Sequence, residues 1–466
     1  MRFLPVLAAS LALLVTSARA ETPKACATAI LTLADAVLAG REKLPKLKAR
    51  GIGAEAGYLK IRYGGLSPDE AATLAHGLRD AGVREALDLA GAVDAWRGGF
   101  AAVTVTPAEL GGQISTLRAI LQHGDAEALL AALAALPPEK RISTLQRIVP
   151  AVVDWPDEKK IALSAIARKH DLAYLEAGLA ATLRDPDGWA DFAASFRDPT
   201  KLMDFVQAWS WAPALVGHPV LPRYPLKAAD MEAARRAIHT ITITAAREPE
   251  RDFLMTYLNQ TGDIPATEKA AQVLLAAVDT GEIRQDGLLD PAWLTAYRAL
   301  RAASADPAAM DGTLATIPFY GRHYLTANGE RTVRDVIDRL VAIEALTPYL
   351  TGKQTALPAM PADLSAAFQP AWPVWSEMAG ALKTAPLTPL AKDGEKASIV
   401  AELLFAAGDT ARLADFVLAV EPPEAQLAMA TDFAMRLDRG CGSAMYHPGE
   451  AMMLSGQPIY RFDPVQ

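Results

Sequence analysis

The segment that precedes the C-terminus brings a thiol, an imidazole and a carboxylate close together. Cys441, His447 and Glu450 lie in the sequence CGSAMYHPGE, and an imidazole beside a thiol can stabilise the nucleophilic thiolate. Catalytic partners are usually brought together by the fold rather than by adjacency in the sequence. The chain has two cysteines, and a single pair in an oxidising compartment is typically bridged. We therefore predict a disulfide between Cys26 and Cys441 and assign no catalytic residue to this segment.

The spacing of the histidines indicates no metal site. None of them lies four residues from another, and the chain contains no HExxH motif. The glycine-rich nucleotide-binding motifs and the GxSxG turn of hydrolases are also missing from the sequence. We predict no cofactor and no metal. We expect His123 and His170 at the C-terminal ends of helices, where a partial positive charge is favourable.

Clusters of aromatic side chains are the best candidates for a binding surface. Aromatic rings on loops can stack on sugars or anchor a protein interface, and they can equally fill the ends of a helical stack. Both interpretations stay open. The clusters consist of Trp209, Trp211 and Tyr224, of Phe319, Tyr320, His323 and Tyr324, and of Trp372 and Trp375.

A basic stretch between residues 41 and 62 stands out in an acidic chain. Its charges at Lys43, Lys46, Lys48 and Arg50 could hold an anionic polymer or the acidic face of a partner. The surrounding segment is rich in glycine as well as in lysine and arginine. A solvated loop is therefore the alternative interpretation.

The elements that would position these residues are helices, because alanine and leucine dominate and β-branched runs are scarce. Ile114, Leu117 and Leu121 follow the spacing of one helical face, and the same spacing recurs from residue 129 onward. Between the two segments, Gly124 suits a left-handed helix end and Asp125 suits the cap of the next helix. This pattern predicts two antiparallel helices joined by a tight turn.

The helical pattern returns along the chain. A second pair of stripes at 163–179 is offset from the first by about 46–47 residues, near the period of HEAT-type helical pairs. Residues 198–208 also match 409–419, each segment opening with an aspartate cap. We expect an all-α fold, an array of antiparallel helical hairpins that forms an irregular α-solenoid of HEAT or TPR style with a non-helical C-terminal tail. The helical-pair period resembles that of α-solenoids in general, including superhelical periplasmic proteins that act on or around peptidoglycan.

The first twenty residues have the order of a Sec-type signal peptide. Arg2 is followed by an apolar run over 3–15 and by small residues at Ala18 and Ala20. This run is about 13 residues long, whereas a spanning helix needs roughly 20. Cleavage would also remove two arginines and no acid, taking the formal charge from −8 to −10. We expect a periplasmic protein with no integral membrane segment after cleavage and no nucleic-acid partner.

Proline, glycine and tryptophan mark the expected boundaries between parts of the chain. The predicted parts are a cleaved signal peptide (1–20), a main helical repeat-like domain (21–346), a Pro/Trp-rich linker or boundary (347–392), a C-terminal helical unit (393–439) and an irregular tail (440–466).

Taken together, these patterns favour an exported helical scaffold or adaptor that binds another envelope protein, and they reveal no catalytic activity. One alternative is a glycan-acting hydrolase or lyase of the cell envelope, with a Trp-lined cleft and peptidoglycan or another glycan as its partner. The other alternative is a carrier for a small molecule or a lipid. The three differ in whether the helices form an open surface, a cleft with facing carboxylates or an apolar cavity.

Overall fold

A computed structural model describes residues 24–44, 52–83, 85–152, 155–180, 253–254, 257–258, 261–279, 292–317 and 332–442. Over these residues the regular structure is helical and no strand is present, which confirms the all-α prediction. Within the same ranges, no helix combines the length and the apolar character needed to cross a bilayer.

The helices fall into two arrays along the chain. The N-terminal array comprises α1 (Lys24–Gly40), α3 (Ile52–Tyr63), α4 (Pro68–Asp80), α5 (Ala86–Gly98), α6 (Ile114–His123), α7 (Ala126–Ala134), α8 (Pro138–Ala151), α9 (Asp157–Lys169) and α10 (Ala173–Ala180), with the 3-10 helices η1 (Arg41–Lys43), η2 (Phe100–Ala102) and η3 (Glu109–Gly112). The C-terminal array comprises α15 (Ile264–Asp279), α16 (Ala292–Ala303), α17 (Pro307–Leu314), α18 (Val333–Leu350), α19 (Trp372–Thr384), α20 (Gly394–Ala406), α21 (Thr410–Leu418) and α22 (Pro423–Gly442), with η5 (Gln369–Ala371) and η6 (Thr388–Lys392).

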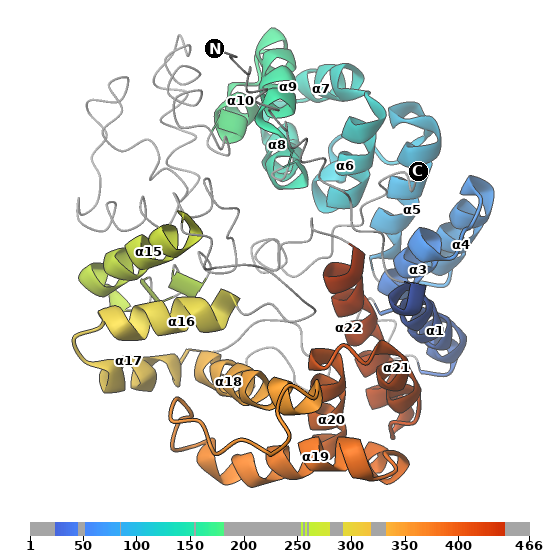
Figure 1. Cartoon of the computed structure of the whole chain (residues 1–466). Helices are drawn as coiled ribbons and strands as arrows, with labels where there is room; N and C mark the ends of the chain where they lie inside the picture. Colours follow the sequence, from blue (N-terminus) through green and yellow to red (C-terminus); the bar gives the residue numbers. More distant parts are fainter. Residues whose placement is uncertain are drawn as a thin grey trace, which may run out of the picture.

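The two arrays meet at the helices nearest the ends of the chain. Helix α1 packs against α21 and α22, and α3 also packs against α22. In space the contacts therefore run from α15 through α16, α18, α20 and α21 to α22 and α1, and onward through α3, α5, α6 and α8 to α10 (Figure 1). The first and last described helices thus occupy the middle of one curved series of helices rather than its ends.

Helix starts follow the capping signals of the sequence where a polar side chain can reach the first turn. Ser67 and Glu70 have the spacing of a capping box and form one, in which the Ser67 N–H donates to Glu70 Oε2 at 2.8 Å. Thr332 and Asp335 form a second capping box at the start of α18, which the sequence analysis did not identify. Each box satisfies backbone N–H groups that the first turn of a helix leaves without partners.

The turn between α6 and α7 is confirmed in position but not in its capping chemistry. Gly124 adopts the left-handed conformation, with φ of 101°, directly after α6. Asp125 precedes α7 but makes no side-chain bond to that helix. Its carboxylate instead accepts a hydrogen bond from the backbone N–H of Phe100 at 2.7 Å. This partner, Phe100, lies 25 positions away in the sequence, so local capping rules could not predict the bond.

The interpretation of the basic stretch at residues 41–62 as a solvated loop is wrong for its second half, because residues 52–63 form the largely buried helix α3. Gly57 within this helix lies at a helix contact and not in a turn, whereas Gly65 after the helix has φ of 63°. A Cβ atom placed on Gly57 would overlap the side chain of Leu78 and press on Leu89, from α4 and α5. Glycine lets α3 approach both neighbours, and this gain offsets its poor helix propensity.

The expected linker at residues 347–392 also contains a helix. Pro373 lies in the first turn of α19, where a missing N–H group costs nothing. Trp375 is 2% exposed, and its ring centroid lies 5.9 Å from that of Phe368. Helix α19 packs against α18 and α20, so this segment belongs to the hydrophobic core of the C-terminal array.

Candidate interaction site

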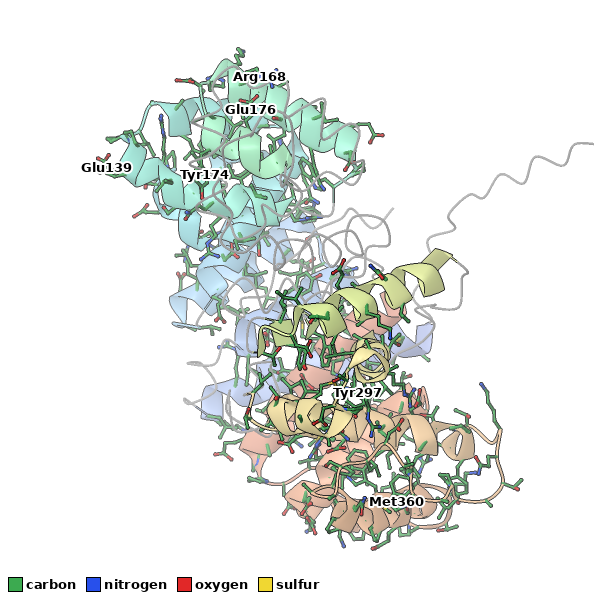
Figure 2. The ribbon with its side chains drawn as sticks, turned by 90° about the vertical axis from the view of Figure 1, so that its left-hand side faces the viewer. Glu139, Arg168, Tyr174, Glu176, Tyr297 and Met360 are labelled. Carbon is green, nitrogen blue, oxygen red and sulfur yellow. The ribbon has the colours of Figure 1, made fainter. Side chains whose placement is uncertain are left out.

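Residues 351–368, here called the anchored loop, join α18 to the short helix η5 without regular structure. The loop carries no charged residue between positions 354 and 362. Leu357 and Met360 are 41% and 46% exposed. Among the described residues of the C-terminal array, Val273 of α15 is the other large apolar side chain exposed to this degree. Met360 lies in the lower, orange part of the molecule in Figure 2, far from Arg168 and Glu176 of the N-terminal array at the top.

The loop begins with a defined turn. Helix α18 ends at Leu350, and Gly352 adopts the left-handed conformation with φ of 77°. The Gly352 N–H donates to the Tyr349 carbonyl at 3.2 Å, and the Gln354 N–H donates to the Pro348 carbonyl at 2.9 Å. These bonds satisfy carbonyls that a helix end leaves open and turn the chain back over the helix.

The far end of the loop is held by a carboxylate of α18. Both oxygens of Asp338 accept from Ser365, one from its backbone N–H at 2.9 Å and the other from its hydroxyl at 2.6 Å. The backbone carbonyl of Asp363 accepts from Arg334 at 2.5 Å. Side chains one turn apart on α18 therefore hold two backbone groups of the loop.

Arg334 is the centre of this attachment, which we call the Arg334 cluster: Arg334, Asp338, Asp311, Tyr297 and the Asp363 carbonyl. The Arg334 guanidinium donates to Asp338 at 2.9 Å and to Asp311 at 3.0 Å, and it also donates to the Tyr297 hydroxyl. It lies 4.9 Å from the centroid of the Tyr297 ring. Arg334 is 3% exposed and Asp338 is 1% exposed. One buried cation thus connects α16, α17, α18 and the loop.

A second layer of ion pairs covers the cluster at the surface. Arg298 makes a bidentate contact to Glu344, with distances of 3.0 and 2.6 Å. Arg301 donates to a carboxylate oxygen of Asp363 at 3.2 Å, and Arg298 lies 3.4 Å from the other oxygen. Asp363 thus attaches the loop to α16. Partly exposed pairs of this kind add little stability individually but define geometry.

Burial and charge act against each other on the titratable groups of the cluster. Burial raises the pKa of Asp338, while the Ser365 hydrogen bonds and the charge of Arg334 oppose the rise. Burial also raises the pKa of Tyr297 to about 12, so its hydroxyl stays protonated and donates to Asp311 at 2.9 Å. The described carboxylates here converge on arginines, an arrangement that stabilises loop position.

The structure tests only a few of the side chains that the sequence singled out. Trp372 and Trp375 are buried in α19, so both rings fill the core instead of forming an exposed surface. Lys43 is exposed in η1. The remaining aromatic and basic candidates lie outside the described residues: Trp209, Trp211, Tyr224, Phe319, Tyr320, His323, Tyr324, Lys46, Lys48 and Arg50.

The expected positions of two histidines are confirmed. His123 ends α6, and its Nδ1 atom lies 3.3 Å from a carboxylate oxygen of Asp125. His170 follows α9, and its Nε2 atom lies 2.8 Å from Glu127 of α7. Both imidazoles therefore lie at helix C-termini and each has a carboxylate neighbour, which accounts for them structurally.

The sequence contained a partial signal for the Arg334 cluster. Arg334 and Asp338 are four residues apart, the spacing at which side chains meet on one helix face. Thr332 and Asp335 likewise have the spacing of a capping box. Nothing in the sequence linked this helix to Tyr297 or to the loop, because those contacts depend on how separate helices pack.

Among the residues that the structure describes, no group of three or more His, Cys, Asp or Glu side chains is arranged to hold a metal ion. Comparisons of the chain with known protein families, with curated proteins and with solved structures find no match. The proposal of a function therefore depends on the geometry of the chain itself.

Proposed function

We propose that this chain is an exported helical scaffold, built as an irregular α-solenoid, whose anchored loop binds another protein of the cell envelope. The observation that carries the proposal is the contrast within this loop. Its first end is fixed by a backbone-bonded turn after α18 and its far end by a buried ionic cluster, while Leu357 and Met360 between them face solvent. The signal-peptide pattern of residues 1–20 supports the compartment.

Exposed apolar side chains on a fixed loop suit protein recognition. Binding energy at interfaces is concentrated in a few anchoring side chains, and a surface that is already ordered loses less entropy when it binds. The end of the Leu357 side chain lies over Gly380 of α19, within reach of a Cβ atom placed there. One side of Leu357 therefore packs over α19, and its exposed side remains available to a partner.

Site-specific photo-crosslinking in intact envelopes tests this function. A photoreactive residue at position 360 should give one discrete crosslinked product, identified by mass spectrometry as an envelope protein. The same residue at position 87, an equally exposed leucine of α5, serves as the matched control and should not give this product. A product common to both positions, or none at position 360, would contradict the proposal. Crosslinks to glycan strands or lipid at position 360 would instead favour the hydrolase or the carrier.

A further inference from the structure

The junction of the two arrays joins residues that are far apart in the sequence. Tyr63 donates a hydrogen bond from its hydroxyl to Asp438 Oδ1 at 2.5 Å, although 375 positions separate them. Arg62 Nε lies 3.3 Å from the same oxygen. Asp438 is 1% exposed, so the last turns of α22 bury a carboxylate against the C-terminal end of α3.

Aromatic rings complete the surroundings of this carboxylate. The Arg62 guanidinium lies 5.9 and 5.5 Å from the ring centroids of Tyr58 and Tyr63, and it donates to the Tyr58 hydroxyl at 2.5 Å. Burial and the nearby Asp438 raise the pKa of Tyr63 above its ordinary value. Tyr63 therefore remains a hydrogen-bond donor, and Asp438 is compensated by a cation and a hydroxyl.

Apolar packing brings α1 against α22 at the same junction. Gly40 at the end of α1 faces Leu427, and a Cβ atom at Gly40 would overlap the Leu427 side chain. Ile30 and Leu33 of α1 are fully buried, as is Phe433 of α22. Glycine at position 40 thus leaves room for the Leu427 side chain where the two helices meet.

A disulfide lies in the same region. Cys26 is buried in the first turn of α1 and is disulfide-bonded. The one other cysteine of the chain is Cys441, a position within the last turn of α22. A bridge between them would close a loop of nearly the whole mature chain, and long loops gain most from such a bond in the chain-entropy description.

We infer that α1, α3 and α22 form a terminal clasp with two independent locks, one covalent between Cys26 and Cys441 and one ionic at Asp438. With either lock in place, the apolar faces of α1 and α22 stay together; when both locks are released, that apolar packing alone holds the junction, which then opens for part of the time. Because the spatial series of helices passes through the clasp, opening it frees the N-terminal array to move relative to the anchored loop. The clasp is thus a redox-sensitive device in a compartment where disulfides persist.

Release of the covalent lock is a two-electron reduction. A dithiol gives two electrons and two protons to the S–S bond, which breaks to give two cysteine thiols, while the reductant forms its own disulfide. The ionic lock does not change in this step. Reduction alone should therefore lower the unfolding midpoint by about 5 °C or more and leave the molecular dimensions as they were.

The test combines Asp438→Ala with dithiothreitol, using the folded mature chain. The radius of gyration is measured by X-ray scattering, and circular dichroism confirms that helix content is kept. Wild type should keep its radius with and without dithiothreitol, and oxidised Asp438→Ala should keep it too. Reduced Asp438→Ala should expand. The control Glu402→Gln breaks a buried bidentate pair to Arg436 between α20 and α22, at 2.9 and 2.7 Å, and should not expand on reduction.

Three results would overturn the inference. The first is expansion of wild type on reduction alone, and the second is no expansion of reduced Asp438→Ala. The third is two titratable thiols in the unreduced wild-type protein, which would remove the covalent lock. Should Asp438→Ala fail to fold, Arg62→Met and Tyr63→Phe in one chain replace it under the same criteria, because together they remove both partners of Asp438 named above; this variant should keep its radius when oxidised and expand when reduced.

Discussion

The terminal clasp and the Arg334 cluster use the same chemistry over very different sequence distances. Each buries an aspartate beside an arginine that stacks on tyrosine, Asp438 with Arg62 in one case and Asp338 with Arg334 in the other. The clasp joins residues 375 positions apart, whereas Arg334 reaches 29 positions to the Asp363 carbonyl. The same chemistry therefore has different structural effects, depending on how far apart in the sequence the joined residues lie. One fixes how two arrays meet, and the other fixes the shape of one loop.

The largest effect is expected when the centre of the Arg334 cluster is removed. Arg334→Ala leaves Asp338 buried without its cation, and it should lower the free energy of unfolding by about 3–5 kcal/mol. Urea denaturation measures this loss, and hydrogen exchange should show faster exchange in residues 351–368 with no change in α1 or α22. Faster hydrogen exchange at α22 than in residues 351–368 would contradict this prediction, because it would show that the Arg334 cluster also stabilises the terminal clasp. Arg334→Lys, which keeps the charge but loses the fork of donors, should be intermediate.

A smaller effect is expected at the clasp. Arg62→Ala removes the cation, but the Tyr63 hydroxyl still donates to Asp438. We expect a loss of about 1–3 kcal/mol in the oxidised protein. Urea denaturation measures this loss, and hydrogen exchange should become faster at α3 and α22 and stay unchanged in the anchored loop. A loss as large as that of Arg334→Ala would contradict the two-lock description, because the disulfide should limit the damage.

The pH dependence of stability sharpens the comparison further. A carboxyl whose pKa is raised by folding stabilises the fold below its unfolded pKa, and this contribution disappears as the pH rises through the folded pKa. Asp338 is such a group. Wild type should therefore gain stability relative to Asp338→Asn as the pH falls from 7 toward 4. Denaturation at a series of pH values gives this difference, and a constant difference would show that burial does not dominate at Asp338.

The smallest effect is expected at Glu127, where the sign is opposite. Hydrogen bonds from Lys169 and His170 lower the pKa of this exposed carboxyl. Its contribution is present above its unfolded pKa and is lost as the pH falls through the folded pKa. Glu127→Gln should shift the unfolding midpoint slightly downward at pH 7 and not at pH 3. An equal shift at both values would mean that the hydrogen-bond geometry matters and the charge does not.

Local features of the fold were predictable from the sequence. The helices on either side of Gly124, the capping box at Ser67 and the left-handed conformation of Gly124 all follow from residues close to one another. Each of these features depends on backbone groups within one turn of the side chain that satisfies them. Short-range rules are sufficient for such elements.

Features that depend on packing between helices were not predictable. Glycines in a loop and glycines at a helix contact look alike in the sequence, so α3 was expected to be irregular. Prolines in a linker and a proline in the first turn of α19 are equally ambiguous. The anchored loop itself was placed within a boundary segment, and its partners Arg334 and Tyr297 lay in other helices. Only the three-dimensional arrangement brings these residues together.

The proposed binding role of the anchored loop can be tested by affinity. The envelope protein crosslinked at position 360 would be purified and its dissociation constant measured for wild type, Met360→Asp and Leu87→Asp. We predict that Met360→Asp weakens binding by tenfold or more, because a charge would replace an apolar anchor, and that Leu87→Asp binds as wild type does. Equal affinities for wild type and Met360→Asp would contradict the assignment of this loop as the binding surface.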